Sequence, residues 1–161
     1  MIKEITTFII NLALGPPWVR DTNCFTGHVP PEENIAGDPV PNRYLAILEN
    51  AGGALLMDIG GVVTATPPST NWPEYAEKAI QLLNRAENYF VAYDDAKELF
   101  DALDNTAGWE LPDPAGGASQ YIACVVNAIA PPAPIENPGE RGLFIFSTNY
   151  IFKIEKATCG E

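Results

Sequence analysis

The chain has 161 residues, and 47% of them are hydrophobic, which is enough apolar material to bury a core and excludes intrinsic disorder as a class. Its 21 acidic residues outnumber its 9 basic ones, and the net charge of −12 argues against binding to nucleic-acid phosphates or anionic lipid. The length predicts a single domain over residues 1–161.

The three cysteines, Cys24, Cys124 and Cys159, lie far apart and show no C-x-x-C spacing. This pattern argues against a structural zinc site and against a disulfide framework, as expected for a reducing compartment. The first fifteen residues contain Glu4 and only a short apolar run, so they predict neither a signal peptide nor a membrane-spanning helix.

The first predicted element is an amphipathic helix over residues 2–14, which Gly15 and two prolines end. Its apolar residues at helical spacing are Ile2, Ile5, Ile9 and Leu12. A short strand is predicted over 22–29, and the proline-rich stretch 30–42 is predicted to be a loop.

Apolar residues bounded by turn signals predict a buried strand over 43–49. The glycines that follow would allow a hairpin with a second run over 54–59, and 60–73 is predicted to be another loop. Residues 74–87 are ambiguous, because their apolar spacing and propensity taken alone favour a helix.

Asn88 is a good N-cap and predicts a helix over 89–104. The apolar stripe of that helix consists of Ala92, Tyr93, Ala96, Leu99, Phe100 and Leu103. Asp94 and Asp95 are expected on its opposite face, where their position in the first turn suits the helix dipole.

The last part of the chain predicts a loop over 105–119, a buried strand over 120–130, a connection over 131–141 and a long strand over 142–156. In the final strand, the even-numbered residues from 144 to 154 form a largely aromatic and apolar face. The last two strands are expected to pair antiparallel.

The search for chemistry finds no catalytic set. His28 is the single histidine, no G-x-S-x-G motif is present, and a strand-end or surface position explains it best. Asp94 and Asp95 are adjacent on a helix and do not face each other. Cys124 lies in an apolar run, which favours a small buried residue over a nucleophile.

The paired glycines at 52–53 and 60–61 lack the residues of a phosphate-binding loop and are interpreted as turns. The aromatic residues at 144–152 are interpreted as core rather than as a ligand platform. The residues therefore predict no catalytic, cofactor or metal site, and no cofactor. Long loops on a packed domain of helices and sheet favour a protein that contacts other subunits.

Two short motifs and the order of elements resemble the tail terminator (tail completion) and minor capsid proteins of long-tailed bacteriophages. In that family a strand with a Q-x-x-x-R-A-like end leads directly into a helix with an early Tyr and Ala, matched here by Gln81, Arg85, Ala86, Tyr89 and Ala96. The family closes with a strand of the form F-S-x-N-(F/Y)-x-(F/V), matched by Phe146, Ser147, Asn149, Tyr150 and Phe152.

The resemblance covers 75–156 well and the first helix loosely, and the loops at 30–42 and 131–141 are longer than the family pattern. It implies a strand over 78–85 despite the helical propensity there. The implied fold is α+β, with a mixed, mainly antiparallel sheet packed against two helices.

By the same resemblance, the chain would form a homo-hexameric ring at the head-proximal end of the tail tube, stop tube polymerisation and present a surface to the head-completion protein. It would be found in the virion tail, and in the host cytoplasm during assembly. The alternatives are another head–tail connector, such as a head-completion or adaptor protein, and a small enzyme of unknown type.

Six copies at −12 each would carry −72 in total, and a share of that charge along the lumen would let DNA slide through without specific binding. No contact with a membrane is expected. The long terminal strand and the loops at 30–42, 60–73 and 131–141 are the candidate contacts between subunits and with the tube.

Overall fold

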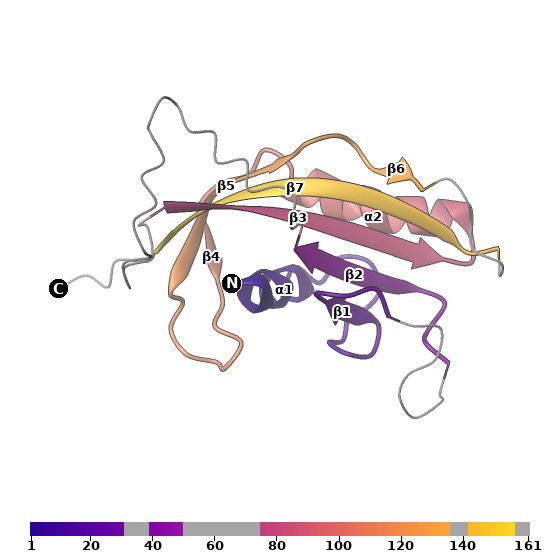
Figure 1. The fold of residues 1–161 in the computed structure, drawn as a ribbon, viewed down its shortest axis with the longest axis horizontal. Coiled ribbons are helices and arrows are strands. Elements are labelled where there is room, and N and C mark those ends of the chain that lie inside the picture. The colour runs from indigo at the N-terminus through magenta and orange to yellow at the C-terminus, as the bar shows by residue number, and fades with distance from the viewer. Residues whose placement is uncertain (31–38, 50–74, 136–141, 157–161) are drawn as a thin grey trace, which may run out of the picture.

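The computed structural model describes residues 1–30, 39–49, 75–135 and 142–156 (Figure 1). The elements in chain order are α1 (Ile2–Asn11), β1 (Cys24–Thr26), β2 (Tyr44–Glu49), β3 (Tyr75–Ala86), α2 (Tyr89–Leu103), β4 (Trp109–Leu111), β5 (Tyr121–Ala128), β6 (Ala133–Pro134) and β7 (Phe144–Lys156). Two helices and a mixed, mostly antiparallel sheet confirm the predicted α+β class. The hairpin expected at 54–59 and the loop at 60–73 lie outside the described residues.

The sheet has the strand order β1-β2-β3-β7-β5-β4, and β6 adds a short pairing to β7. Only the β1–β2 pair is parallel among the described strands. The expected antiparallel pairing of the last two long strands is confirmed, because β5 and β7 pair from Tyr121↔Lys156 to Ala128↔Tyr150. A register shift between Ala123 and Val125 interrupts this ladder.

The β3–β7 pair forms the spine of the sheet. Its register runs without interruption from Tyr75↔Glu155 to Ala86↔Phe144. Figure 1 shows the two long strands side by side, curving together along the longest axis, with the shorter strands attached at either end. The period-two pattern of the C-terminal segment therefore belongs to a central strand. The strand β7 is long because β3 pairs with it over twelve residue pairs.

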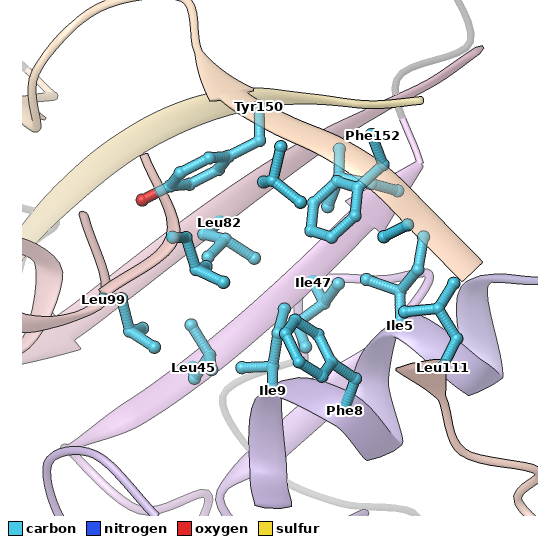
Figure 2. Close-up of a cluster of buried hydrophobic side chains, with 14 of the residues drawn as sticks. Ile5, Phe8, Ile9, Leu45, Ile47, Leu82, Leu99, Leu111, Tyr150 and Phe152 are labelled. Atoms are coloured by element: carbon cyan, nitrogen blue, oxygen red, sulfur yellow. The ribbon is translucent and has the colours of Figure 1, made fainter. Parts of the chain in front are cut away.

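Both helices pack on one face of this sheet. The main core joins Ile5 and Ile9 of α1 and Leu99 of α2 to Tyr150, Phe152 and Ile154 of β7. Figure 2 shows this cluster, with Tyr150 and Phe152 above the side chains of α1 and β2. The predicted apolar face of the last strand is thus confirmed: Phe146, Thr148, Tyr150, Phe152 and Ile154 are all buried.

A smaller apolar cluster lies on the other face of the sheet. It consists of Phe25, Val40, Tyr44, Ala46 and Leu83, with Leu48 and Ile145 packed against it. Among the described residues no helix covers this face, and the odd-numbered residues of β7 are half-buried there, apart from the exposed Glu155. We call it the open face below.

The first helix is shorter than expected. It ends at Asn11 rather than at residue 14, because Ala13 adopts a left-handed conformation (φ 52°) that an α-helix of L-residues cannot continue. Gly15 (φ 72°) then turns the chain, as its position before the prolines suggested. The strand expected over 22–29 is also shorter, since β1 covers only three residues and Gly27 (φ 82°) ends it.

The ambiguous segment 74–87 is a strand. The helical interpretation of its propensity is wrong, and the strand over 78–85 is confirmed and extended to Tyr75–Ala86. Pairing with β2 on one side and β7 on the other supplies the tertiary context that overrides local preference.

Helix α2 begins as predicted, with Asn88 accepting a hydrogen bond from the Phe90 backbone N–H at 2.8 Å. Two short strands fall in stretches that were predicted to be loops. β4 lies within 105–119 and pairs with β5, and β6 lies within 131–141 and pairs with β7.

Candidate functional site

The residues of the two resemblance motifs meet along the β3–β7 spine. Gln81 stands opposite Asn149 in the register, and its amide donates a 2.9 Å hydrogen bond to the Ser147 hydroxyl. On the helix side of the sheet, Ala86 and Ala96 pack against Phe146. Sequence reasoning placed these residues in two separate segments, and the fold brings both segments into one seam between β3, β7 and the start of α2.

The open face of this seam is polar at its centre and charged toward one end. Lys153 of β7 approaches Glu77 on this face at 3.6 Å. Lys78 of β3 and Glu49 form an ion pair of 2.5 Å on the helix side, because they stand opposite Phe152 and Ile80 in the register. These side chains are all at least a quarter exposed, so each pair contributes little to stability. Within each pair the two opposite charges cancel, so neither pair adds net charge to its face of the sheet.

An aromatic stack links the core to the surface at the start of α2. Tyr89 contacts the rings of Phe144 and Phe146 at centroid distances of 5.7 and 5.1 Å, and it contacts Phe90 at 5.5 Å. Tyr93 also contacts Phe146, at 5.5 Å. The stack ends in Phe90, whose side chain is 70% exposed, the largest exposed fraction among the described large apolar residues.

An ion pair anchors α2 to the sheet. Arg43 donates two hydrogen bonds, of 2.8 and 2.6 Å, to the two carboxylate oxygens of Asp95. Asp95 was expected on the solvent face in the first turn of the helix, and this prediction is wrong: it lies in the second turn and is buried. Asp94 is exposed as expected. The Asp94–Asp95 pair therefore does not form a joint site, because one carboxylate serves an ion pair and the other faces solvent.

The sheet buries polar side chains on its helix side, among them Asn84, Thr148 and Tyr150. The amide of Asn84 makes no hydrogen bond to a described residue. Burial raises the pKa of the Tyr150 phenol, with a smaller contribution from Asp104. In Figure 2 the Tyr150 hydroxyl points away from Phe152. These groups are polar, yet they are buried in the apolar interior, so we assign them to the core.

The single histidine and the two described cysteines differ in their exposure to solvent. His28 is exposed beyond the end of β1 and contacts the Phe25 ring edge-on at 6.0 Å. Cys24 is fully buried, and burial raises its pKa to about 12. Such a thiol stays protonated and is a poor nucleophile.

Cys124 was predicted to be buried, but its side chain is only half-buried, because it sits at the register shift in β5. Partial burial raises the pKa of this thiol, and the neighbouring Glu155 carboxylate raises it further. The paired glycines at 52–53 and 60–61, and Cys159, lie outside the described residues. Within the described residues there is no group of three potential metal ligands.

A groove of about 470 Å³ opens between the C-terminal half of α1 and the β4–β5 hairpin. Its lining residues are Phe8, Asn11, Leu12, Trp109, Glu110, Pro112, Gly117 and Ser119. The Phe8 and Trp109 rings are 5.3 Å apart, and the Trp109 indole donates its N–H to Thr106. With its polar atom already bound, the indole presents an apolar surface. Sequence reasoning missed this groove because it depends on β4, which is too short to leave a pattern.

No helix in the described part of the chain has both the length and the apolar character needed to cross a membrane. Comparison of the chain with protein-family models, with curated proteins and with solved structures found no match.

Proposed function

We propose that the chain is a virion structural protein that forms a ring at the head-proximal end of a phage tail tube. The ring stops tube polymerisation and provides the surface for head–tail joining. The observation that carries this proposal is the β3–β7–α2 seam. The resemblance implies a strand over 78–85 where propensity favours a helix, and a strand that leads into α2 is present there.

Contacts between the two motifs support the same proposal. The Gln81 amide reaches Ser147, and Tyr89 packs against Phe146, so each motif contacts the other on both faces of the sheet. Residues that were matched on sequence alone thus form one structural unit. A chance match of short motifs does not require such contacts.

A ring of this kind ends growth by geometry. Head-to-tail contacts between identical subunits form a closed ring when the rotation between neighbours closes. One rim of the ring matches the last ring of the tube, and the other rim does not reproduce a tube surface. Further tube subunits therefore have no matching surface to bind.

The acidic character of the chain supports DNA passage without adhesion. On α2, the side chains of Asp94, Glu98 and Asp101 are exposed, and the one basic residue of the helix, Lys97, binds Asp101. If this face lines the lumen, reversing its charge with Asp94→Lys and Glu98→Lys should slow DNA ejection, whereas the neutral Asp94→Asn and Glu98→Gln should have a smaller effect. A ring with a neutral or basic lumen would count against this role.

Negative-stain images test the function directly. The purified protein is imaged alone and after mixing with tubes assembled from the cognate tube protein. We expect rings, or tubes capped at one end, and a mutant virus that lacks the protein should carry overlong tails of uneven length. Normal tails together with unjoined heads in that mutant would favour the other head–tail connector role.

A further inference from the structure

The first turn of α2 carries two exposed aromatic side chains, Tyr89 and Phe90, which we call the aromatic patch. Phe90 is 70% exposed and Tyr89 is 41% exposed. The patch has a rigid base, because the Tyr89 ring contacts Phe144 and Phe146, and the Asn88 cap accepts the backbone N–H of Phe90. Exposed aromatic rings on such a base lose little conformational entropy on binding, which is typical of binding hot spots.

A hollow of about 270 Å³ adjoins the aromatic patch. Its lining includes Asn88 and Val91, which flank the patch in the chain. The other lining residues are Asn42, Arg43, Ala86 and Glu87. The start of α2 therefore offers a partner both a protruding ring to cover and a concave surface beside it.

The exposed charges beside the patch are acidic. Glu87 precedes the patch in the chain, and Asp94 follows Phe90 by one helical turn; both side chains are exposed. Residues four apart on a helix lie on the same side, so the Asp94 carboxylate is a neighbour of the Phe90 ring. A partner that covers this ring must approach both carboxylates.

Basic side chains at this end of the molecule are held by other groups. Arg43 donates hydrogen bonds to both carboxylate oxygens of Asp95, and Lys97 forms an ion pair with Asp101. Arg85 lies over an aromatic ring on the open face. The border of the patch therefore keeps a negative sign.

This sign selects the kind of partner. A second copy of the chain carries a net charge of −12 and would meet like charge at the patch. Nucleic acid and anionic lipid are disfavoured for the same reason. An apolar patch with an acidic border is complementary to a protein segment in which apolar residues are flanked by lysine or arginine.

We propose that the aromatic patch and its hollow dock a different, basic protein through an amphipathic segment. Apolar side chains of that segment cover Phe90, and its cationic side chains face Glu87 and Asp94. The inference goes beyond the proposed function, because it requires neither a ring nor a tail tube. The contact is confined to the start of α2, and Glu98 and Asp101 lie outside it.

A model peptide tests the chemistry of the surface. The isotope-labelled full chain is titrated by NMR with an amphipathic helical peptide that has leucine on one face and lysine on the other. A second peptide replaces every lysine with glutamate. The lysine peptide should shift the amides of residues 87–94 most, and the glutamate peptide should shift none. Added salt should weaken the binding, because the charges are exposed.

One pair of variants tests the aromatic part of the contact. Phe90→Ala removes the ring that the peptide covers, and it should weaken binding of the lysine peptide at least about tenfold, as for a hot-spot aromatic. Ile129→Ala is the matched control, because Ile129 is 64% exposed but belongs to neither the patch nor the hollow. Its binding should equal that of the wild type.

A second pair of variants tests the charged part. Glu87→Gln combined with Asp94→Asn removes two carboxylates from the border of the patch, and it should weaken binding about fivefold. Asp21→Asn combined with Glu110→Gln removes two exposed carboxylates elsewhere, so the net charge changes equally. At physiological salt this control should change binding less than about twofold, because distant exposed charges are screened.

Three outcomes would overturn the inference: a lysine peptide that shifts no amide, shifts that persist in Phe90→Ala, and a glutamate peptide that binds as well. Circular dichroism and thermal unfolding show whether each variant is folded. If the peptide binds at the patch but the chain caps no tail tubes, the inference stands and the proposed function fails. If rings cap tubes and the peptide does not bind at the patch, the function stands and the inference fails.

Discussion

Arg43, which precedes β2, holds Asp95 in the second turn of α2 through two hydrogen bonds, and the two partners differ greatly in exposure. The Arg43 side chain is 44% exposed, whereas the Asp95 side chain is 5% exposed. Hydrogen bonding to Asp95 raises the pKa of Arg43, so the guanidinium stays charged. The cost of breaking the pair should therefore depend on which partner is removed.

Arg43→Ala should be the more damaging change. It leaves a buried carboxylate without its partner, which costs about 3–5 kcal/mol. Asp95→Ala leaves an arginine that water can reach, and we expect a loss of about 1–2 kcal/mol. Urea unfolding measures both. Asp94→Ala is the control, because Asp94 is exposed and should stay within about 0.5 kcal/mol of the wild type. Equal losses for Arg43→Ala and Asp95→Ala would contradict this account.

The two faces of β7 should differ in their tolerance to truncation. Phe152 is fully buried against the helices, and Phe152→Ala should cost about 3–5 kcal/mol because it leaves a cavity. Its neighbour Ile151 lies half-buried on the open face, and Ile151→Ala should cost only about 1 kcal/mol. Similar costs for both substitutions would show that the open face is packed as tightly as the core.

Asn84 offers a stabilising substitution. Its amide is buried on the helix side of β3 and makes no hydrogen bond to a described residue. Asn84→Val replaces the amide with an apolar β-branched side chain suited to a strand, and it should raise the free energy of unfolding by about 1 kcal/mol. Chemical denaturation checks the sign, and a clear loss of stability would mean that the amide is satisfied in solution.

Stability should decline on the alkaline side. The Cys24 thiol has a pKa of about 12 in the folded chain and about 9.0 unfolded, so the unfolded chain loses this proton first. The buried thiol's contribution to the free energy of unfolding is fully present below pH 9, and it is lost as the pH rises toward 12. Burial raises the pKa of Tyr44 and Tyr150 as well. Their pKa in the unfolded chain is 10.0, so their effect on stability changes mainly above pH 10.

The interval between pH 9 and 10 therefore reports mainly on Cys24. Urea midpoints of the wild type should fall across this interval, and those of Cys24→Ala should fall less steeply. Cys124→Ala serves as the control, because that thiol is only half-buried. Parallel curves for the wild type and Cys24→Ala would exclude the buried thiol as the cause.

The elements with strong periodicity could be predicted from the sequence. The alternation in β7 identifies both its strand character and its buried face, and the apolar stripe of α2 with Asn88 before it places that helix within one residue. β3 could not be predicted from its own residues, because Ala, Glu and Lys favour a helix there. Only its neighbours β2 and β7 make it a strand.

The residues and short strands of the candidate functional site were harder to predict from the sequence. Asp95 has the composition of a solvent-facing residue, and its burial depends on Arg43, more than fifty residues earlier in the chain. β4 and β6 are too short to show any period. The groove beside β4 and the exposure of Phe90 arise from tertiary packing, and neither leaves a local signal.

The uninterrupted register between β3 and β7 has a mechanical consequence. A pull that separates Tyr75 from Phe144 acts along the strands, so it loads the hydrogen bonds of all twelve pairs at once rather than one after another. Such shear loading resists force far better than peeling from one end. The spine of this fold is therefore built to transmit tension along its length without unravelling.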